Sequence, residues 1–178
     1  MYNLFVESDH YCLYQKKKYE IHKLILFIYE NQHNKKVVEL EKIKVTNYRD
    51  ILGKACWVLS KETLESLKQY PPAATQSSIA SAANNYLSSN SARTITPQLI
   101  INNPEMYNAE YQKILSADIM FPIVMIRNHR ARNHIIFDGH HRLVKALQFN
   151  VPSINAYIIN DMRALDDYFG HTSQDTKM

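Results

Sequence analysis

Apolar residues recur at regular intervals early in the chain, and these intervals predict a helix followed by a strand. The segment KYEIHKLILFIYEN carries apolar residues three and four positions apart, the spacing of one helix face. This predicted face consists of Ile21, Leu24, Ile25 and Ile28. The preceding run of Lys16, Lys17 and Lys18 is interpreted as the solvated start of the helix. VVELEKIKV, residues 37–45, alternates apolar and charged residues, which predicts a half-buried strand.

The composition of the chain changes in its middle part. SKETLESLKQY begins with Ser60, a favourable N-cap residue, and predicts a short helix that ends before Pro71. Residues 71–97 are rich in serine, alanine and asparagine and carry almost no charge. A weakly amphipathic helix and a mobile insertion explain this stretch equally well.

Strand and helix patterns alternate after Pro97. Apolar runs with β-branched residues predict strands, and runs with three- and four-residue spacing predict helices. The predicted elements are a strand in QLIINNP, a helix in EMYNAEYQKILSAD, a buried strand in FPIVMI, a strand in IIF, a helix in LVKALQF and a strand over 154–159. This alternation predicts an α/β fold in which helices pack on a mixed or parallel sheet.

Composition limits the classes of protein to which the chain can belong. Hydrophobic residues make up 46% and charged residues 21% of its 178 residues, as in ordinary globular domains. The net charge of +4 permits an anionic partner such as a nucleotide or a nucleic acid. Cys12 and Cys56 are too few for a disulfide framework or a cysteine-based zinc site. Since no apolar run can span a bilayer and no signal peptide is evident, we expect a cytoplasmic protein without a membrane partner.

The sequence DGHHR, residues 138–142 and here called the DGHHR turn, carries the most informative chemistry. Gly139 is one of only three glycines, and its place between a predicted strand and a predicted helix indicates a conformational requirement. Asp138 is expected to cap the helix, because its carboxylate can accept hydrogen bonds from first-turn N–H groups. N–H groups at a helix start bind anions, and His140, His141 and Arg142 add donors there. The turn therefore predicts a phosphate site.

Two other interpretations of the DGHHR turn stay open. A strand–turn–helix junction capped by Asp138 needs no ligand, and Arg142 can pair with a surface carboxylate instead of a phosphate. A metal site formed by His140 and His141 alone is disfavoured, because adjacent helical residues point about 100° apart. The identity of any metal ligands therefore stays unknown.

The polar connection RNHRARNH, residues 127–134, precedes the strand IIF. Its arginines Arg127, Arg130 and Arg132 are interpreted either as a solvated basic loop or as a contact for nucleic acid. The chain contains none of the motifs GxxxxGK[ST], GxGxxG, HExxH and GxSxG. The first two mark nucleotide-binding loops, the third marks zinc proteases and the fourth marks serine hydrolases.

The ordered pattern PIVMI, a polar connection, IIFDGHHRLVKAL and NVPSINAYII resembles the ParB/sulfiredoxin-like superfamily. The resemblance extends over residues 94–160. It implies an α/β (α+β) fold with a mixed sheet and packed helices, preceded here by a partly helical N-terminal extension. Members include partition proteins that bind and hydrolyse CTP, sulfiredoxins, and nucleotide-dependent free serine kinases whose turn also contains D-G-H-H-R.

The resemblance implies roles for the residues of the turn. Gly139 and Arg142 match the G-x-x-R element that binds nucleotide phosphates, and His141 matches the histidine before that arginine. His140 stands where sulfiredoxins have their catalytic cysteine, so repair of sulfinic acids by that route is not expected. His140 is retained as a candidate for phosphate binding and for catalysis.

Phosphoryl transfer of the serine-kinase type uses a carboxylate base, and three carboxylates are candidates for catalysis. Glu105 is the first candidate for the base and Glu41 is the second. Asp138 is a candidate for orienting a metal-bound water or the phosphate acceptor, in competition with its expected capping role.

We therefore expect a nucleotide-binding ParB-like protein, either a phosphotransferase or a nucleoside triphosphatase, with ATP, ADP or CTP and Mg²⁺ as the cofactors that the resemblance implies. One alternative is a nucleic-acid-binding protein or partition-like nuclease that uses Arg127, Arg130 and Arg132; another is a non-catalytic interaction module. The expected organisation is a helical extension over 1–36, a main domain over 37–160 with an insertion near 71–96, and a tail over 161–178.

Overall fold

The computed structural model describes residues 7–8, 11–54, 56–67 and 94–171. The chain divides into a larger unit of residues 1–49 and 118–178 and a smaller unit of residues 50–117. This division differs from the expected one, because the N-terminal extension and the C-terminal tail belong to the same unit as the sheet. Most of the predicted insertion lies outside the described residues.

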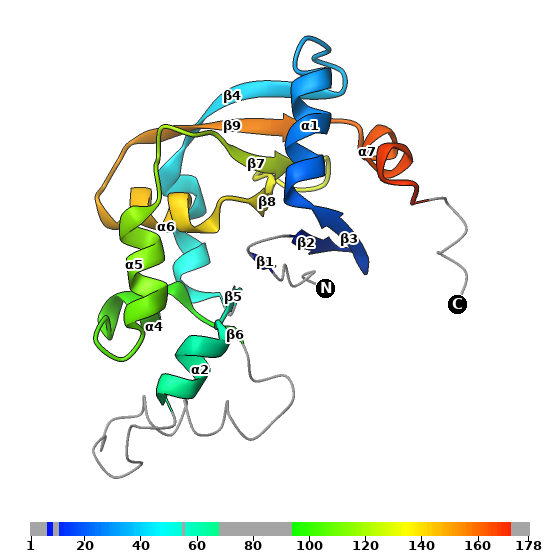
Figure 1. Ribbon diagram of the computed structural model, residues 1–178. Helices are drawn as coiled ribbons and strands as arrows, with labels where there is room; N and C mark the ends of the chain where they lie inside the picture. Colours follow the sequence, from blue (N-terminus) through cyan, green and yellow to red (C-terminus); the bar gives the residue numbers. More distant parts are fainter. Residues whose placement is uncertain (1–6, 9–10, 55, 68–93, 172–178) are drawn as a thin grey trace. The chain divides into compact units, whose positions relative to one another are not determined.

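The larger unit is built on a four-stranded mixed sheet (Figure 1). Its strands lie in the order β4 (Val38–Lys44), β9 (Ser153–Ile159), β7 (Ile123–Ile126) and β8 (Ile135–Asp138). β7 and β9 are parallel, whereas β4 pairs with β9 and β8 pairs with β7 in antiparallel fashion. Each of these strands falls in a segment for which the sequence predicts a strand, and the mixed sheet with packed helices is confirmed.

One face of this sheet packs against N-terminal elements and the C-terminal helix. These elements are β2 (Tyr11–Tyr14), which also pairs with β1 (Glu7–Ser8), together with β3 (Lys17–Glu20), α1 (Ile21–Asn31) and α7 (Met162–Phe169). Figure 1 shows α1 lying across the strands. The core cluster on this face consists of Cys12, Tyr14, Tyr19, Leu24, Phe27, Ile28, Val38, Val124, Ile126, Phe137, Ile159 and Leu165. The segments before and after the predicted main domain therefore complete its core.

The N-terminal region departs from its prediction in two respects. Lys16 lies in the turn between β2 and β3, and Lys17 and Lys18 lie in β3, so the run does not form the start of a helix; Gln15 and Lys16 adopt φ values of 49° and 65°. The predicted helix α1 does form, but Ile25 is 57% exposed and Phe27 is buried in its place. The buried stripe of α1 is thus rotated relative to the predicted stripe.

The opposite face of the sheet carries α6 (His140–Gln148), which packs on β7 and β9. Its buried apolar side chains are Leu143, Val144, Ala146 and Leu147. Strand side chains alternate between the two faces, so Ile123 and Met125 of β7 point toward α6 while Val124 and Ile126 join the other core. The DGHHR turn, which joins β8 to α6, lies beside the first residue of β7.

The smaller unit combines short helices with a two-stranded ribbon. The ribbon pairs β5 (Trp57–Val58) with β6 (Thr94–Ile95), and the helices are α2 (Lys61–Leu67), α4 (Pro97–Asn102) and α5 (Asn108–Ser116). A 3₁₀ segment, η1 (Val45–Gly53), runs from β4 into this unit. Ser60 Oγ accepts a hydrogen bond from Thr63 N at 3.2 Å, which confirms the predicted cap of α2.

The strand predicted in QLIINNP is wrong, because this segment forms the helix α4. Thr96 caps the helix by accepting a hydrogen bond from Leu99 N at 3.2 Å. Pro97 occupies the first helical position, where its fixed φ is favourable and its missing N–H costs nothing. Over the described ranges of the chain, no helix is long and apolar enough to cross a membrane.

Candidate functional site

Gly139 occupies the centre of the DGHHR turn and is the N-cap residue of α6. Its φ of 100° and ψ of 27° lie in the left-handed region that side chains rarely adopt. A Cβ atom at this position would lie 2.6 Å from Ile123 Cγ2 and 3.0 Å from Arg142 Nη2. Glycine is therefore required here both by the backbone conformation and by the close approach of β7.

The N-cap position of α6 is occupied by Gly139 and not by Asp138, which was predicted there. Asp138 is the last residue of β8, and its carboxylate accepts a hydrogen bond from Arg142 Nη2 at 2.7 Å. Gly139 itself provides no side-chain cap. The positive end of α6 therefore begins without an N-cap side chain, an arrangement that suits an anion.

Arg142 is held in place by the segment before β7 as well as by Asp138. Its Nη1 donates to the backbone carbonyl of Pro122 at 2.6 Å and, more weakly, to that of Phe121 at 3.5 Å. The side chains of Arg142 and Asp138 are 20% and 12% exposed, so their ion pair is largely shielded from water. These bonds use three of the five N–H groups of the guanidinium. The pair also offsets the unfavourable position of a cation in the first helical turn.

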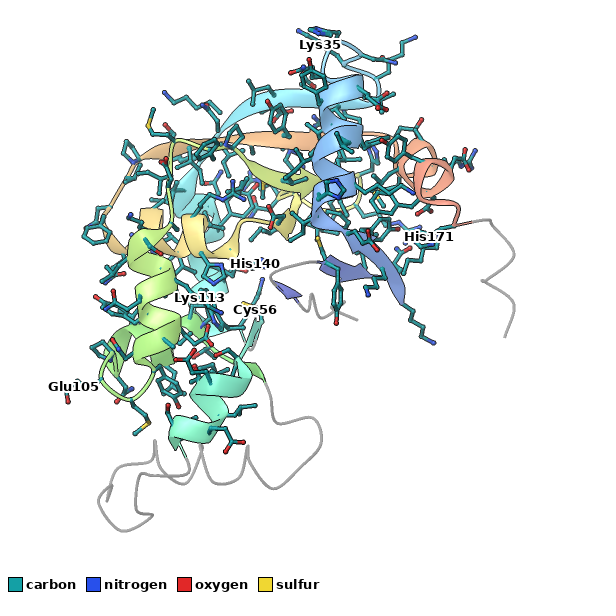
Figure 2. All side chains as sticks on the ribbon, viewed as in Figure 1. Lys35, Cys56, Glu105, Lys113, His140 and His171 are labelled. Carbon is teal, nitrogen blue, oxygen red and sulfur yellow. The ribbon has the colours of Figure 1, made fainter. Side chains whose placement is uncertain are left out.

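The two histidines of the turn differ in burial. His140, labelled in Figure 2, is only 5% exposed, whereas His141 is half-buried. Both belong to the first turn of α6, directly after the N-cap. The structure therefore brings together the whole set of predicted turn residues, namely Asp138, Gly139, His140, His141 and Arg142.

The two carboxylates considered as a catalytic base belong to other elements of the structure. Glu105 belongs to the smaller unit, between α4 and α5, and its side chain is exposed (Figure 2). Glu41 lies in the middle of β4, where it accepts a hydrogen bond from Arg127 Nη2 at 2.5 Å. Its second oxygen lies 3.7 Å from His134 Nε2. Glu41 is therefore engaged in an ion pair of its own.

Arg127 differs from the two other arginines of the 127–134 connection. It directly follows β7, and its guanidinium contacts Glu39 at 3.5 Å, Glu41, and the side-chain oxygen of Asn160. Arg130 and Arg132 are exposed instead. The predicted set of three basic residues is thus divided into one that is neutralised within the fold and two that face solvent.

His134 lies in the same ion-pair network as Arg127 and Glu41. Burial lowers the pKa of His134, Arg127 lowers it further, and Glu41 opposes both effects. Its Nδ1 atom is buried and has no hydrogen-bond partner among the described residues. The folded chain therefore favours the neutral imidazole.

Mild acid is expected to destabilise the fold through His134. Because the folded pKa lies below the unfolded one, the unfolded chain binds more protons below about pH 6.5. This contribution to the free energy of unfolding is fully present above that pH and is lost as the pH falls toward the folded pKa. His134→Gln should flatten the pH dependence by up to about 1.4 kcal/mol per pH unit in this window, measured by urea unfolding. His33→Gln, at an exposed site, is the control, and an equal change in both variants would contradict the assignment.

No metal centre is evident in the parts of the chain that the structure describes. Within those residues, no three or more side chains of histidine, cysteine, aspartate or glutamate are grouped so that they could hold a metal ion. The donors of the DGHHR turn, namely first-turn N–H groups and the Arg142 guanidinium, suit an anion.

Comparisons with known proteins give one partial similarity. No protein-family model and no solved structure matches the chain. The uncharacterized protein MJ0188 of Methanocaldococcus jannaschii is 36% identical to the chain over 59 residues. The matched stretch covers 33% of this chain and only 22% of the length of that protein. The chain is thus similar to a small part of MJ0188.

Proposed function

We propose that the chain binds a nucleotide through its phosphates at the DGHHR turn. The observation that carries this proposal is an arginine fixed beside a helix start that has no N-cap side chain. The helix dipole and the first-turn N–H groups favour phosphate at such a position. Arg142 retains N–H groups beyond those given to Asp138, Phe121 and Pro122, and charge-assisted bonds of this kind are among the strongest hydrogen bonds.

The proposed ligand class follows from the resemblance to the ParB/sulfiredoxin-like superfamily. The order β7, β8, turn, α6 and β9 within a mixed sheet supports that resemblance. Gly139 and Arg142 match the element that binds nucleotide phosphates in the superfamily. We therefore propose ATP, ADP or CTP as the ligand. Mg²⁺ would be held mainly by the nucleotide phosphates, since the turn itself offers only one carboxylate, Asp138.

Phosphoryl transfer or nucleotide hydrolysis is the activity that we propose for this site. Such reactions depend mainly on clamping the phosphates and on placing a hydroxyl or water in line. Asp138 is paired with Arg142, so its best-supported role is to position the guanidinium. His140 stays a candidate for contact with the reacting phosphate, and the base is not assigned.

A thermal-shift panel tests the proposed binding. The panel contains ATP, ADP, CTP, pyrophosphate and inorganic phosphate, each with and without Mg²⁺. A nucleotide at a hundred times its Kd should stabilise the chain by about 2.7 kcal/mol. Arg142→Ala should weaken nucleotide binding by about 10- to 100-fold, because a charged hydrogen bond is worth roughly 1.5–3 kcal/mol.

Arg163→Ala is the matched control, since Arg163 is an exposed arginine on α7. Each variant is compared with and without ligand, so that a lower melting temperature of the free variant does not affect the result. If nucleotide raises the melting temperature of Arg142→Ala as much as that of the wild-type chain, the placement of the site at the DGHHR turn is contradicted. If no phosphate compound raises the melting temperature of the wild-type chain, a non-catalytic interaction module becomes the better-supported function.

A further inference from the structure

The segment directly before β7 exposes two large apolar side chains. Met120 is 80% exposed and Phe121 is 64% exposed. A short turn fixes the backbone here: Met120 N donates to Asp118 Oδ1 at 2.9 Å, and Phe121 N donates to Asp118 O at 3.3 Å. Pro122 follows and disfavours the helical conformation at Phe121. The aromatic ring of Phe121 is therefore presented to solvent from a defined backbone.

The same segment holds the arginine of the DGHHR turn. Arg142 Nη1 donates to Pro122 O at 2.6 Å and lies 3.5 Å from Phe121 O. Covalent geometry places the centre of a phenylalanine ring at most about 6 Å from its own carbonyl oxygen. The ring of Phe121 therefore lies within about 10 Å of Arg142 Nη1 in every rotamer that its side chain can adopt.

An exposed aromatic ring at this distance suits the base of a nucleotide. Phosphates bound at Arg142 leave the rest of the ligand close to the ring of Phe121, because the sugar and base extend from the phosphates over a comparable length. The face of an aromatic ring is apolar, and a nucleobase covers it by stacking. Phe121 and Arg142 thus offer the two groups that a nucleotide requires, an apolar plane for the base and a cation for the phosphates.

We propose that Phe121 is the base-stacking residue of the nucleotide site. Its ring stacks on the nucleobase while Arg142 and the first turn of α6 hold the phosphates. This inference rests on the proposed function, because it extends the same site from the phosphates to the base. Phe121 then makes a nucleotide bind more tightly than the bare phosphate chain. Since every base has a π-face, stacking by itself accepts both purine and pyrimidine nucleotides.

Isothermal titration calorimetry tests the proposal by separating the base from the phosphates. ATP and CTP are compared with inorganic tripolyphosphate, which has three phosphates but no sugar or base, all with Mg²⁺. The wild-type chain should bind a nucleotide more tightly than tripolyphosphate. Phe121→Ala should weaken nucleotide binding by about 5- to 150-fold, the range expected for one base–aromatic stack. It should leave tripolyphosphate binding unchanged, because alanine keeps the backbone carbonyl that lies beside Arg142.

Phe149→Ala is the matched control. Phe149 is also an exposed phenylalanine, at 57%, but it is the C-cap residue of α6 and lies about 14 Å along the helix axis from the DGHHR turn. This variant should bind nucleotide and tripolyphosphate as the wild-type chain does. Equal losses of nucleotide affinity in Phe121→Ala and Phe149→Ala would overturn the proposal.

Phe121→Trp adds a spectroscopic readout to the affinities. It keeps an aromatic plane, so nucleotide affinity should be retained, and nucleotide should quench its fluorescence while tripolyphosphate should not. The unsubstituted chain, with Trp57 as its only tryptophan, supplies the background signal. Quenching of the new tryptophan by nucleotide alone supports stacking on the base.

The outcomes separate this inference from the proposed function. If the wild-type chain binds tripolyphosphate as tightly as nucleotide, the stacking role of Phe121 is overturned and the phosphate site stands. If Phe121→Ala loses affinity for both kinds of ligand equally, Phe121 shapes the arginine site and does not contact the base, which also overturns the inference. If the wild-type chain binds neither kind of ligand, the proposed function fails, and the inference fails with it.

Discussion

Replacing Glu110 by alanine is expected to lower the free energy of unfolding of the smaller unit by about 3–5 kcal/mol. Glu110 is 1% exposed. Its carboxylate accepts hydrogen bonds from Ser60 N at 2.8 Å, Thr63 Oγ1 at 3.0 Å and Trp57 Nε1 at 3.1 Å. Alanine would leave these donors buried without their acceptor. Burial alone would raise the pKa of Glu110, but these hydrogen bonds hold that pKa below its ordinary value.

Urea unfolding followed by tryptophan fluorescence measures this effect. Trp57 is the only tryptophan of the chain and donates directly to Glu110, so its emission reports on the affected region. Glu62→Ala, at an exposed position of the first turn of α2, should cost less than about 1 kcal/mol. A Glu110→Ala variant as stable as Glu62→Ala would show that the buried carboxylate does not hold the smaller unit together.

Replacing Gly139 by alanine is expected to cost about 3 kcal/mol and to abolish nucleotide binding. The left-handed conformation costs an alanine roughly 1–2 kcal/mol, and the approach of the new Cβ to Ile123 adds an overpacking cost of about 1–3 kcal/mol. Because the turn and β7 would have to move apart, the first-turn N–H groups would lose the position that the phosphate requires. For a chain of this size the melting temperature should fall by about 6–12 °C.

The two other glycines form a matched series. Gly170 has a φ of 75° but open space around its Cα, so Gly170→Ala measures the conformational cost alone, about 1–2 kcal/mol. Gly53 has neither a positive φ nor a neighbour within 4 Å, so Gly53→Ala should be close to neutral. Only Gly139→Ala should lose the nucleotide-induced thermal shift. Equal destabilisation by Gly139→Ala and Gly170→Ala would show that Ile123 moves away without cost.

The sheet and α6 could be predicted because their signals are local. The continuous apolar run FPIVMI suits β7, whose side chains are buried on both faces. The three- and four-residue spacing in LVKALQF defines the buried side of α6. The DGHHR turn was also predictable, since the strand end, the glycine and the helix start follow one another directly.

Two errors in secondary structure have different causes. In QLIINNP the decisive signal lies just before the segment, where Thr96 and Pro97 form a helix start that outweighs the β-branched composition. In the β2–β3 hairpin, Gln15 and Lys16 adopt positive φ values although neither is a residue that turns of this kind prefer. The first error was avoidable from the sequence, whereas the second conformation is set by pairing of the strands.

The partners of the charged side chains could not be predicted, because they come from other parts of the fold. The sequence indicates Asp138 as an N-cap residue, but in the structure its carboxylate accepts a hydrogen bond from Arg142. The register of β4 with β9, and of β9 with β7, brings Glu41 close to Arg127. No local pattern marks the burial of Glu110, whose donors lie about fifty positions earlier in the chain.

An NMR titration of backbone amides tests the phosphate site most directly. The amide resonances of isotope-labelled protein are followed as ATP, ADP or CTP with Mg²⁺ is added. Gly139 is one of three glycines, so its resonance can be compared with those of Gly53 and Gly170 in the same spectrum. We expect the amide resonances of Gly139, His140, His141 and Arg142 to shift most and those of Gly53 and Gly170 to stay in place. Nucleotide binding that shifts other amides but leaves Gly139 unchanged would contradict it.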